Sequence, residues 1–286
     1  MKKAFILILS LYAFCANAIT LEQVRFHNEA SDTTKITEIL VAISKQNFDN
    51  PNSRINYIAH SFLGKPYVAH TLESEVEMLT VNIDEVDCTT FVETVIALAY
   101  TAGEGRSSWR DFIHNLEKIR YRSGRLDGYS SRLHYISDWI IDNNHRGNIK
   151  EVSNIFPFYS YQVKTINFMS QNRDKYAALK DSIEFEKIKN IEIGYRNHRF
   201  PYIKKSDLRK KEIQTAFRAG DIIALTTRIN GLDVSHLGII TLINNIPHLL
   251  HASSVKGEVT IENKPLHETL MNSRLNTGVR VIRLNQ

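Results

Sequence analysis

The chain has 286 residues, of which 43% are hydrophobic and 23% are charged, and its formal net charge is +5. This balance is that of a globular protein with one sizeable domain, and it excludes a low-complexity or coiled-coil protein. The mild positive charge suits an anionic partner, but no basic stripe interleaved with aromatic residues accompanies it, so we expect no nucleic-acid binding.

Residues 1–18 have the pattern of a secretory signal peptide. Lys2 and Lys3 precede a short apolar run, and small residues follow up to Ala18. The apolar run is too short for a stable membrane anchor. The sequence therefore predicts export, to the periplasm or out of the cell. We expect residues 19–286 to form a single domain with helical insertions.

Cleavage after Ala18 would remove Cys15 and leave Cys88 as the sole cysteine of the mature chain. Such a chain can form no internal disulfide. A lone thiol in an oxidising compartment is a liability, through oxidation and unwanted pairing. It is either an inert packed residue or a reacting group, and its surroundings in the sequence must decide between the two.

Hydrophobic residues at helical spacing fill the first half of the chain. They predict helices over residues 32–46, 53–63, 88–101, 108–120 and 131–144, while residues 78–83 alternate loosely, like a strand. The segment 88–101 is the most apolar one after the signal peptide. We expect a buried helix that begins at or near Cys88, with Asp87 as its N-cap.

The second half changes character at Gly220. Residues 148–219 are polar and basic, and they predict only one or two helices between 169 and 190, followed by an extended loop at 199–202. Short β-rich runs then occupy residues 221–225, 237–243, 247–252, 259–262 and 279–284. Their spacing predicts an antiparallel sheet of about five strands. Helices followed by strands indicate an α+β fold.

Cys88 and His236 form a candidate catalytic pair. A thiolate at a helix N-terminus is stabilised by free backbone N–H groups and the helix dipole. It becomes an effective nucleophile when a histidine can take or share its proton. His236 begins a predicted strand, and His251 ends the neighbouring one. His251 is therefore the candidate for the third polar group, which fixes the orientation and tautomer of the base.

A zinc-dependent hydrolase is a minor alternative. The sequence contains no His-Glu-x-x-His motif, and the single cysteine of the mature chain cannot build a thiolate zinc site. The 11 histidines of the chain leave other ligand sets open. We expect no metal and no other cofactor.

Three segments together resemble the signature of the NlpC-type papain-like cell-wall cysteine hydrolases. They are Asp87–Phe91 (DCTTF), Ser235–Ile239 (SHLGI) and His251–Ser253 (HAS). The segment Leu63–Val68 (LGKPYV) resembles another motif of that superfamily, whose tyrosine, here Tyr67, faces the catalytic cleft. The resemblance implies a papain-like fold in which the cysteine helix packs on an antiparallel sheet.

The match is closer to one branch of this superfamily, formerly described only as a domain of unknown function, whose members are similar to N-acetylmuramoyl-L-alanine amidases. It rests on Val86–Glu93 (VDCTTFVE), Arg132–Trp139 (RLHYISDW) and His251–Ser254 (HASS), and it extends from about residue 55 to the C-terminus. The resemblance implies that peptidoglycan fragments are the substrates. It favours small turnover fragments, and leaves open whether they are anhydro-muramyl forms.

The resemblance also assigns roles to single residues. Cys88 is the nucleophile, His236 the base and His251 its orienting partner. The candidates for substrate binding are Tyr67, Asp87, Thr89, Arg132, Asp138 and Ser235. Two departures from the superfamily pattern, at Thr90 and at residues 69–71, suggest a reshaped pocket. The cleavage position of the wider superfamily therefore does not transfer to this chain.

The predicted reaction is hydrolysis of the amide between the lactyl group of muramic acid and L-alanine. A γ-D-glutamyl endopeptidase would use the same three residues, so it is the nearest alternative. A catalytically silent wall-binding module is the alternative from a different class, and a nonspecific papain-type protease is a weaker one. Mass analysis of the products separates the amidase from the endopeptidase, because only the amidase releases a free L-alanine amine.

Overall fold

The computed structural model describes residues 19–285, so the predicted signal peptide lies outside the described part of the chain. The first half is helical, with α1 (Glu29–Ser44), α2 (Pro51–His60), α3 (Cys88–Gly103), α4 (Trp109–Arg120) and α5 (Ile136–His145). These are the five helices predicted from the sequence. The last of them begins later than predicted, because Arg132 is extended and pairs with Tyr121 in an isolated bridge.

The polar middle of the chain contains more strand than predicted. Two of its helices are α6 (Phe168–Gln171) and α7 (Ser182–Ile193), and α8 (Lys211–Gln214) follows further on. The prediction of a loop at residues 199–202 is wrong, because these residues lie within the strand β5 (His198–Lys204), which pairs with β4 (Ser160–Lys164).

Within residues 19–285, eight strands form the main sheet, where about five were predicted. Their order is β4-β5-β10-β6-β7-β8-β9, and β3 (Ile149–Glu151) also pairs with β10 (Asn276–Leu284). The remaining strands are β6 (Ile222–Thr227), β7 (Val234–Ile243), β8 (Ile246–Ser253) and β9 (Glu258–Pro265), and the short helix α9 (Leu266–Met271) follows β9. All five predicted strands are present, as β6 to β10. A separate parallel pair joins β1 (Val24–Phe26) to β2 (Leu79–Val81).

The extra strand β4 escaped prediction because it lacks an apolar run. Along β4, half-buried residues alternate with exposed ones, and Tyr161 and Val163 are among the exposed side chains. By contrast, all six residues of β6 are buried, because the sheet is covered on both faces. Ile222 and Ala224 join the apolar cluster around α3, and Ile223 and Leu225 join a second cluster on the opposite face.

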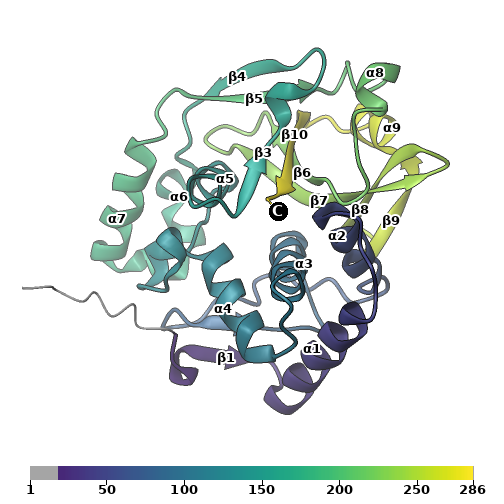
Figure 1. The fold of residues 1–286 in the computed structure, drawn as a ribbon. Coiled ribbons are helices and arrows are strands. Elements are labelled where there is room, and N and C mark those ends of the chain that lie inside the picture. Colours follow the sequence, from purple (N-terminus) through teal and green to yellow (C-terminus); the bar gives the residue numbers. More distant parts are fainter. Residues whose placement is uncertain (1–18, 286) are drawn as a thin grey trace, which may run out of the picture.

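Helix α3 lies in the middle of the molecule, between α4 and the sheet (Figure 1). It packs on β7 and β8 and also contacts α1, α2 and α4, which is why its residues from Thr90 to Ala99 are all buried. Its N-terminus is thereby held against the sheet. None of the helices within residues 19–285 is long and apolar enough to cross a membrane.

Candidate active site

Asp87 caps helix α3, as predicted. One oxygen of its carboxylate accepts hydrogen bonds from the backbone N–H groups of Thr89 (2.9 Å) and Thr90 (2.8 Å). The Thr90 hydroxyl in turn accepts from the backbone N–H of Asp87 at 2.8 Å, which completes a capping box. The cap starts the helix at Cys88. The thiol therefore stands at the first helical residue, beside the positive end of the helix dipole.

The Cys88 thiol lies next to the start of β7. Burial and the charge of Asp87 raise the pKa of the thiol to about 11, while the backbone N–H of Leu237 and the hydroxyl of Thr89 act in the opposite direction. Leu237 directly follows His236 in β7. The sulfur therefore lies close to the backbone next to the predicted base, while no hydrogen bond joins the side chains of Cys88 and His236 within the described residues.

His236 and His251 are hydrogen-bonded to each other across neighbouring strands. Nε2 of His236 lies 2.6 Å from Nδ1 of His251, and the two rings meet nearly at right angles, at 86°. Strands β7 and β8 are antiparallel neighbours, which brings the start of one beside the end of the other. Burial and the neighbouring His251 lower the pKa of His236 to about 3. The structure thus brings together the two histidines that the sequence singled out.

Glu262 continues this line of contacts, and reasoning from the sequence missed it. Its Oε1 lies 2.9 Å from Nε2 of His251, and its Oε2 lies 3.2 Å from the Lys256 ammonium. Burial by itself would raise the pKa of Glu262, but hydrogen bonds with His251 and Lys256 lower it below its usual value. The available signal was weak: a carboxylate on the strand predicted to follow that of His251.

Tyr67 lies beside the cysteine. Burial raises the pKa of its phenol, and Cys88 and Asp87 add to this rise. The Tyr67 backbone N–H donates to the carbonyl oxygen of Gly257 at 2.8 Å, so the segment carrying the tyrosine is attached to the start of β9. Ser235 is exposed just before His236, and its hydroxyl accepts a hydrogen bond from Asn276 at 2.9 Å.

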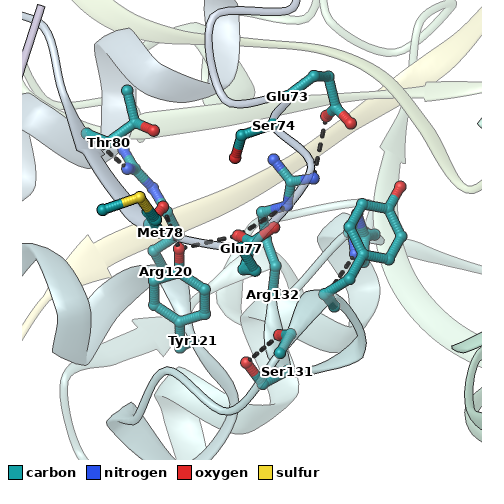
Figure 2. A network of polar contacts seen from close by, with 12 residues as sticks. Glu73, Ser74, Glu77, Met78, Thr80, Arg120, Tyr121, Ser131 and Arg132 are labelled. Carbon is teal, nitrogen blue, oxygen red and sulfur yellow. Dashed lines mark hydrogen bonds and ion pairs between the residues drawn. The ribbon is translucent and has the colours of Figure 1, made fainter. Parts of the chain in front are cut away.

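Arg132 and Asp138 are engaged in ion pairs with other parts of the protein. Figure 2 shows the Arg132 guanidinium between Glu73 (2.9 Å) and Glu77 (3.4 Å). The buried Asp138 carboxylate accepts two hydrogen bonds from Arg122, at 2.9 and 2.5 Å, and one from the Tyr195 hydroxyl, at 2.7 Å. Neither side chain is hydrogen-bonded to Cys88, His236 or His251 within the described residues. A substrate contact for either of them stays a prediction.

A cavity of about 450 Å³ lies away from this site, at the opposite end of α3, against Arg54, Tyr100 and Glu104. We place the chemistry at the Cys88 end, because the nucleophile and a candidate base are found together there. Within residues 19–285, no group of three His, Cys, Asp or Glu side chains is arranged so that it could hold a metal ion.

A family model and a solved structure assign the chain to the same family. A family model described as N-acetylmuramoyl-L-alanine amidase-like (AmiA-like) matches residues 57–279. Among solved structures, an N-acetylmuramoyl-L-alanine amidase from Bacteroides uniformis is 37% identical, with a TM-score of 0.77, and the match covers 82% of this chain and 99% of that one. No curated protein matches the chain.

Two further solved structures are similar. A protein from Bacteroides fragilis, named as a candidate xylanase, is 39% identical, with a TM-score of 0.74, and the match covers 80% of this chain and 100% of that one. A Legionella pneumophila protein is 21% identical, covers 90% of this chain and 96% of its own, and has a TM-score of 0.70, which shows a shared fold. At the level of the family, the family model and the Bacteroides uniformis amidase support a hydrolase that acts on peptidoglycan. The chain belongs to the N-acetylmuramoyl-L-alanine amidase-like family.

Proposed function

We propose that this protein is a cysteine amidase that hydrolyses the bond between the lactyl group of muramic acid and L-alanine in muropeptides. The observation that carries the proposal is the hydrogen-bonded pair of His236 and His251 beside a cysteine at a helix start. The family match supports the choice of substrate. The helix-start cysteine packed on an antiparallel sheet supports an NlpC-type, papain-like architecture, and the pattern of residues 1–18 supports export to the compartment that holds this substrate.

In the first half of the proposed reaction, the sulfur of Cys88 attacks the lactyl carbonyl carbon while His236 accepts the thiol proton. The oxyanion that forms is stabilised by the Cys88 backbone N–H at the positive end of α3. The tetrahedral intermediate then breaks its carbon–nitrogen bond. The leaving L-alanine amine takes the proton from His236, and a thioester to Cys88 remains.

In the second half, water attacks the thioester carbonyl and gives up a proton to His236. The carbon–sulfur bond breaks, the muramyl lactyl group leaves as a carboxylic acid, and the sulfur regains its proton from His236. His251 holds the imidazole in place throughout, in the way that the third group of a catalytic triad does. Tyr67, Asp87, Thr89 and Ser235 lie close enough to this reaction to shape substrate binding.

The resting pair is neutral in this proposal. A thiol with a raised pKa beside an imidazole with a lowered pKa disfavours a preformed thiolate–imidazolium pair. Proton transfer to His236 therefore accompanies the attack of the sulfur on the carbonyl. This differs from the thiolate at a helix N-terminus expected from the sequence, because burial raises the pKa of the thiol and lowers that of the imidazole.

Mass spectrometry of muropeptides tests the proposal. Muramyl and anhydro-muramyl peptides are incubated with the protein and with Cys88→Ala, in the presence and absence of EDTA. We expect a free stem peptide with an L-alanine amine and an unsubstituted muramyl sugar from the wild type alone, unaffected by EDTA. A cut within the stem would instead identify the γ-D-glutamyl endopeptidase, and no cleavage would favour the silent wall-binding module. Loss of activity with EDTA would contradict the cysteine mechanism.

A further inference from the structure

Glu262 is held in place from three sides. Its carboxylate contacts His251 and Lys256, and its backbone carbonyl oxygen accepts a hydrogen bond from Nδ1 of His248 at 2.9 Å. The pairing of β8 with β9 shifts register between His248 and Leu250. His251 pairs with Thr260, so Glu262, two residues further along β9 and on the same face, is the diagonal neighbour of His251.

The contacts of Glu262 determine where the protons of both catalytic histidines lie. An ionised carboxylate only accepts hydrogen bonds, so Nε2 of His251 must donate to Glu262. Burial lowers the pKa of His251 and favours its neutral form, which carries a single ring proton. Nδ1 of His251 therefore has a free lone pair, and it accepts from Nε2 of His236 at 2.6 Å.

This chain of bonds leaves one ring nitrogen of His236 as a base. With its proton on Nε2, neutral His236 has its lone pair on Nδ1, the nitrogen that His251 does not occupy. In the opposite arrangement, His251 would donate from Nδ1, and the lone pair of His236 would be used up in accepting that bond. Nδ1 of His236 would then carry a proton and could not take one from Cys88.

We propose that Glu262 is a positioning residue that selects the reactive tautomer of His236 by fixing the tautomer of His251. The effect of the tautomer on catalysis rests on the proposed function. The tautomers themselves can be measured without it. Besides one another and His236, the charged and titratable groups in contact with Glu262 or His251 are Lys256 from the turn before β9 and His248 from β8.

Glu262→Gln is the decisive substitution, because Lys256 controls which way the new amide points. An ammonium group only donates hydrogen bonds, so it attracts the amide oxygen and leaves the amide NH₂ facing His251. Nε2 of His251 must then accept, which selects the unreactive tautomers. We expect Glu262→Gln to lower kcat/KM by roughly 10³- to 10⁴-fold, as when a triad carboxylate becomes an amide. Glu262→Ala imposes no orientation and should lose only about 10- to 100-fold.

The matched control removes the lysine. Lys256→Met alone should change kcat/KM by less than about threefold, because the ammonium is partly exposed and lies outside the relay. In Glu262→Gln/Lys256→Met the amide is free to turn its oxygen toward His251. This double variant should recover activity relative to Glu262→Gln. Thermal unfolding midpoints, measured for the wild type and all four variants, separate a loss of folded protein from a change of tautomer.

Nitrogen NMR of the histidine side chains reads the tautomers without substrate. We expect His236 to carry its proton on Nε2 in the wild type and on Nδ1 in Glu262→Gln. An unchanged tautomer in Glu262→Gln, or activity within about threefold of the wild type, overturns the inference. If the tautomer switches but the wild type cleaves no muropeptide, the inference stands and the proposed function fails. If the wild type cleaves muropeptides but the tautomer does not switch in Glu262→Gln, the proposed function stands and the inference fails.

Discussion

Cys88 and His236 have pKa values displaced in opposite directions by the same cause. Burial raises that of the thiol to about 11 and lowers that of the imidazole to about 3. Over a wide range of pH, the thiol and the imidazole therefore share one titratable proton, whichever residue carries it. The pair binds a second proton only at acid pH and loses the last one only at alkaline pH. Amide hydrolysis should accordingly show a broad plateau, lost at acid pH when a second proton binds and at alkaline pH when the last proton leaves.

Alkylation of the thiol tests this account at neutral pH. We expect iodoacetamide to modify Cys88 roughly a hundredfold more slowly than free cysteine at pH 7, with a rate that rises toward pH 11, because only the thiolate reacts. Asp87→Asn keeps a good helix cap but removes a charge that raises the thiol pKa, so alkylation should accelerate. Mass spectrometry gives both rates. A fast rate that is level from neutral to alkaline pH in the wild type would indicate a preformed ion pair instead.

At the scale of elements, the close approach of β7 and β8 allows the two histidines to meet, and Gly238 permits this approach. A Cβ atom at Gly238 would lie 2.7 Å from Cδ1 of Leu249, 3.0 Å from the carbonyl oxygen of Leu250 and 3.1 Å from Cβ of His251. Two of these three contacts are with atoms that cannot move without shifting the strand. A side chain at this position would therefore push His251 away from His236.

Gly238→Ala should cost both stability and activity. We expect a loss of about 1–3 kcal/mol in the free energy of unfolding from overpacking. We expect kcat to fall by more than the reduced fraction of folded protein explains, because His251 moves away from His236. Urea unfolding and muropeptide kinetics measure the two effects. Gly194→Ala at the end of α7 is the control, since its Cβ would meet only Ile191 O, at 3.3 Å. Equal effects of the two substitutions would contradict the role assigned to Gly238.

At the scale of the whole molecule, a buried ion pair joins three separate elements beneath the site. Glu93 of α3 accepts a hydrogen bond from Arg120 of α4 at 2.6 Å, and the two side chains are only 3% and 2% exposed. Arg120 also donates to the carbonyl oxygen of Thr80 in β2 at 2.7 Å, in the network of Figure 2. Burial raises the pKa of Glu93, and the charge of Arg120 opposes this rise.

Removing one partner of this pair should destabilise the fold more than removing both. Arg120→Met leaves the Glu93 carboxylate buried and unpaired, which should cost about 3–5 kcal/mol in urea unfolding at pH 7. Glu93→Leu/Arg120→Met should recover most of that loss. Without Arg120 the pKa of Glu93 rises further, so the folded variant binds its proton more tightly and the deficit should shrink as the pH falls to 5. A deficit independent of pH would argue against an uncompensated charge.

The local sequence determined the elements that carry the proposed chemistry. The helix that begins at Cys88 follows from an apolar periodic segment and a capping aspartate, both within a few residues of the cysteine. The strands of His236 and His251 follow from short apolar runs between turn residues. Each depends on neighbours in the chain, so one sequence sufficed to predict them.

Only the tertiary structure decided what completes the site. Glu262 meets His251 as a diagonal neighbour across the pairing of β8 with β9, and register is a property of paired strands that no single segment encodes. The edge strand β4 escaped prediction because its half-buried face carries only polar side chains and its apolar residues, Tyr161 and Val163, are exposed, so it has no apolar run. Arg132 and Asp138, two candidates for substrate binding, form ion pairs within the protein. Their partners are distant in the chain, so these ion pairs could not be predicted from the sequence.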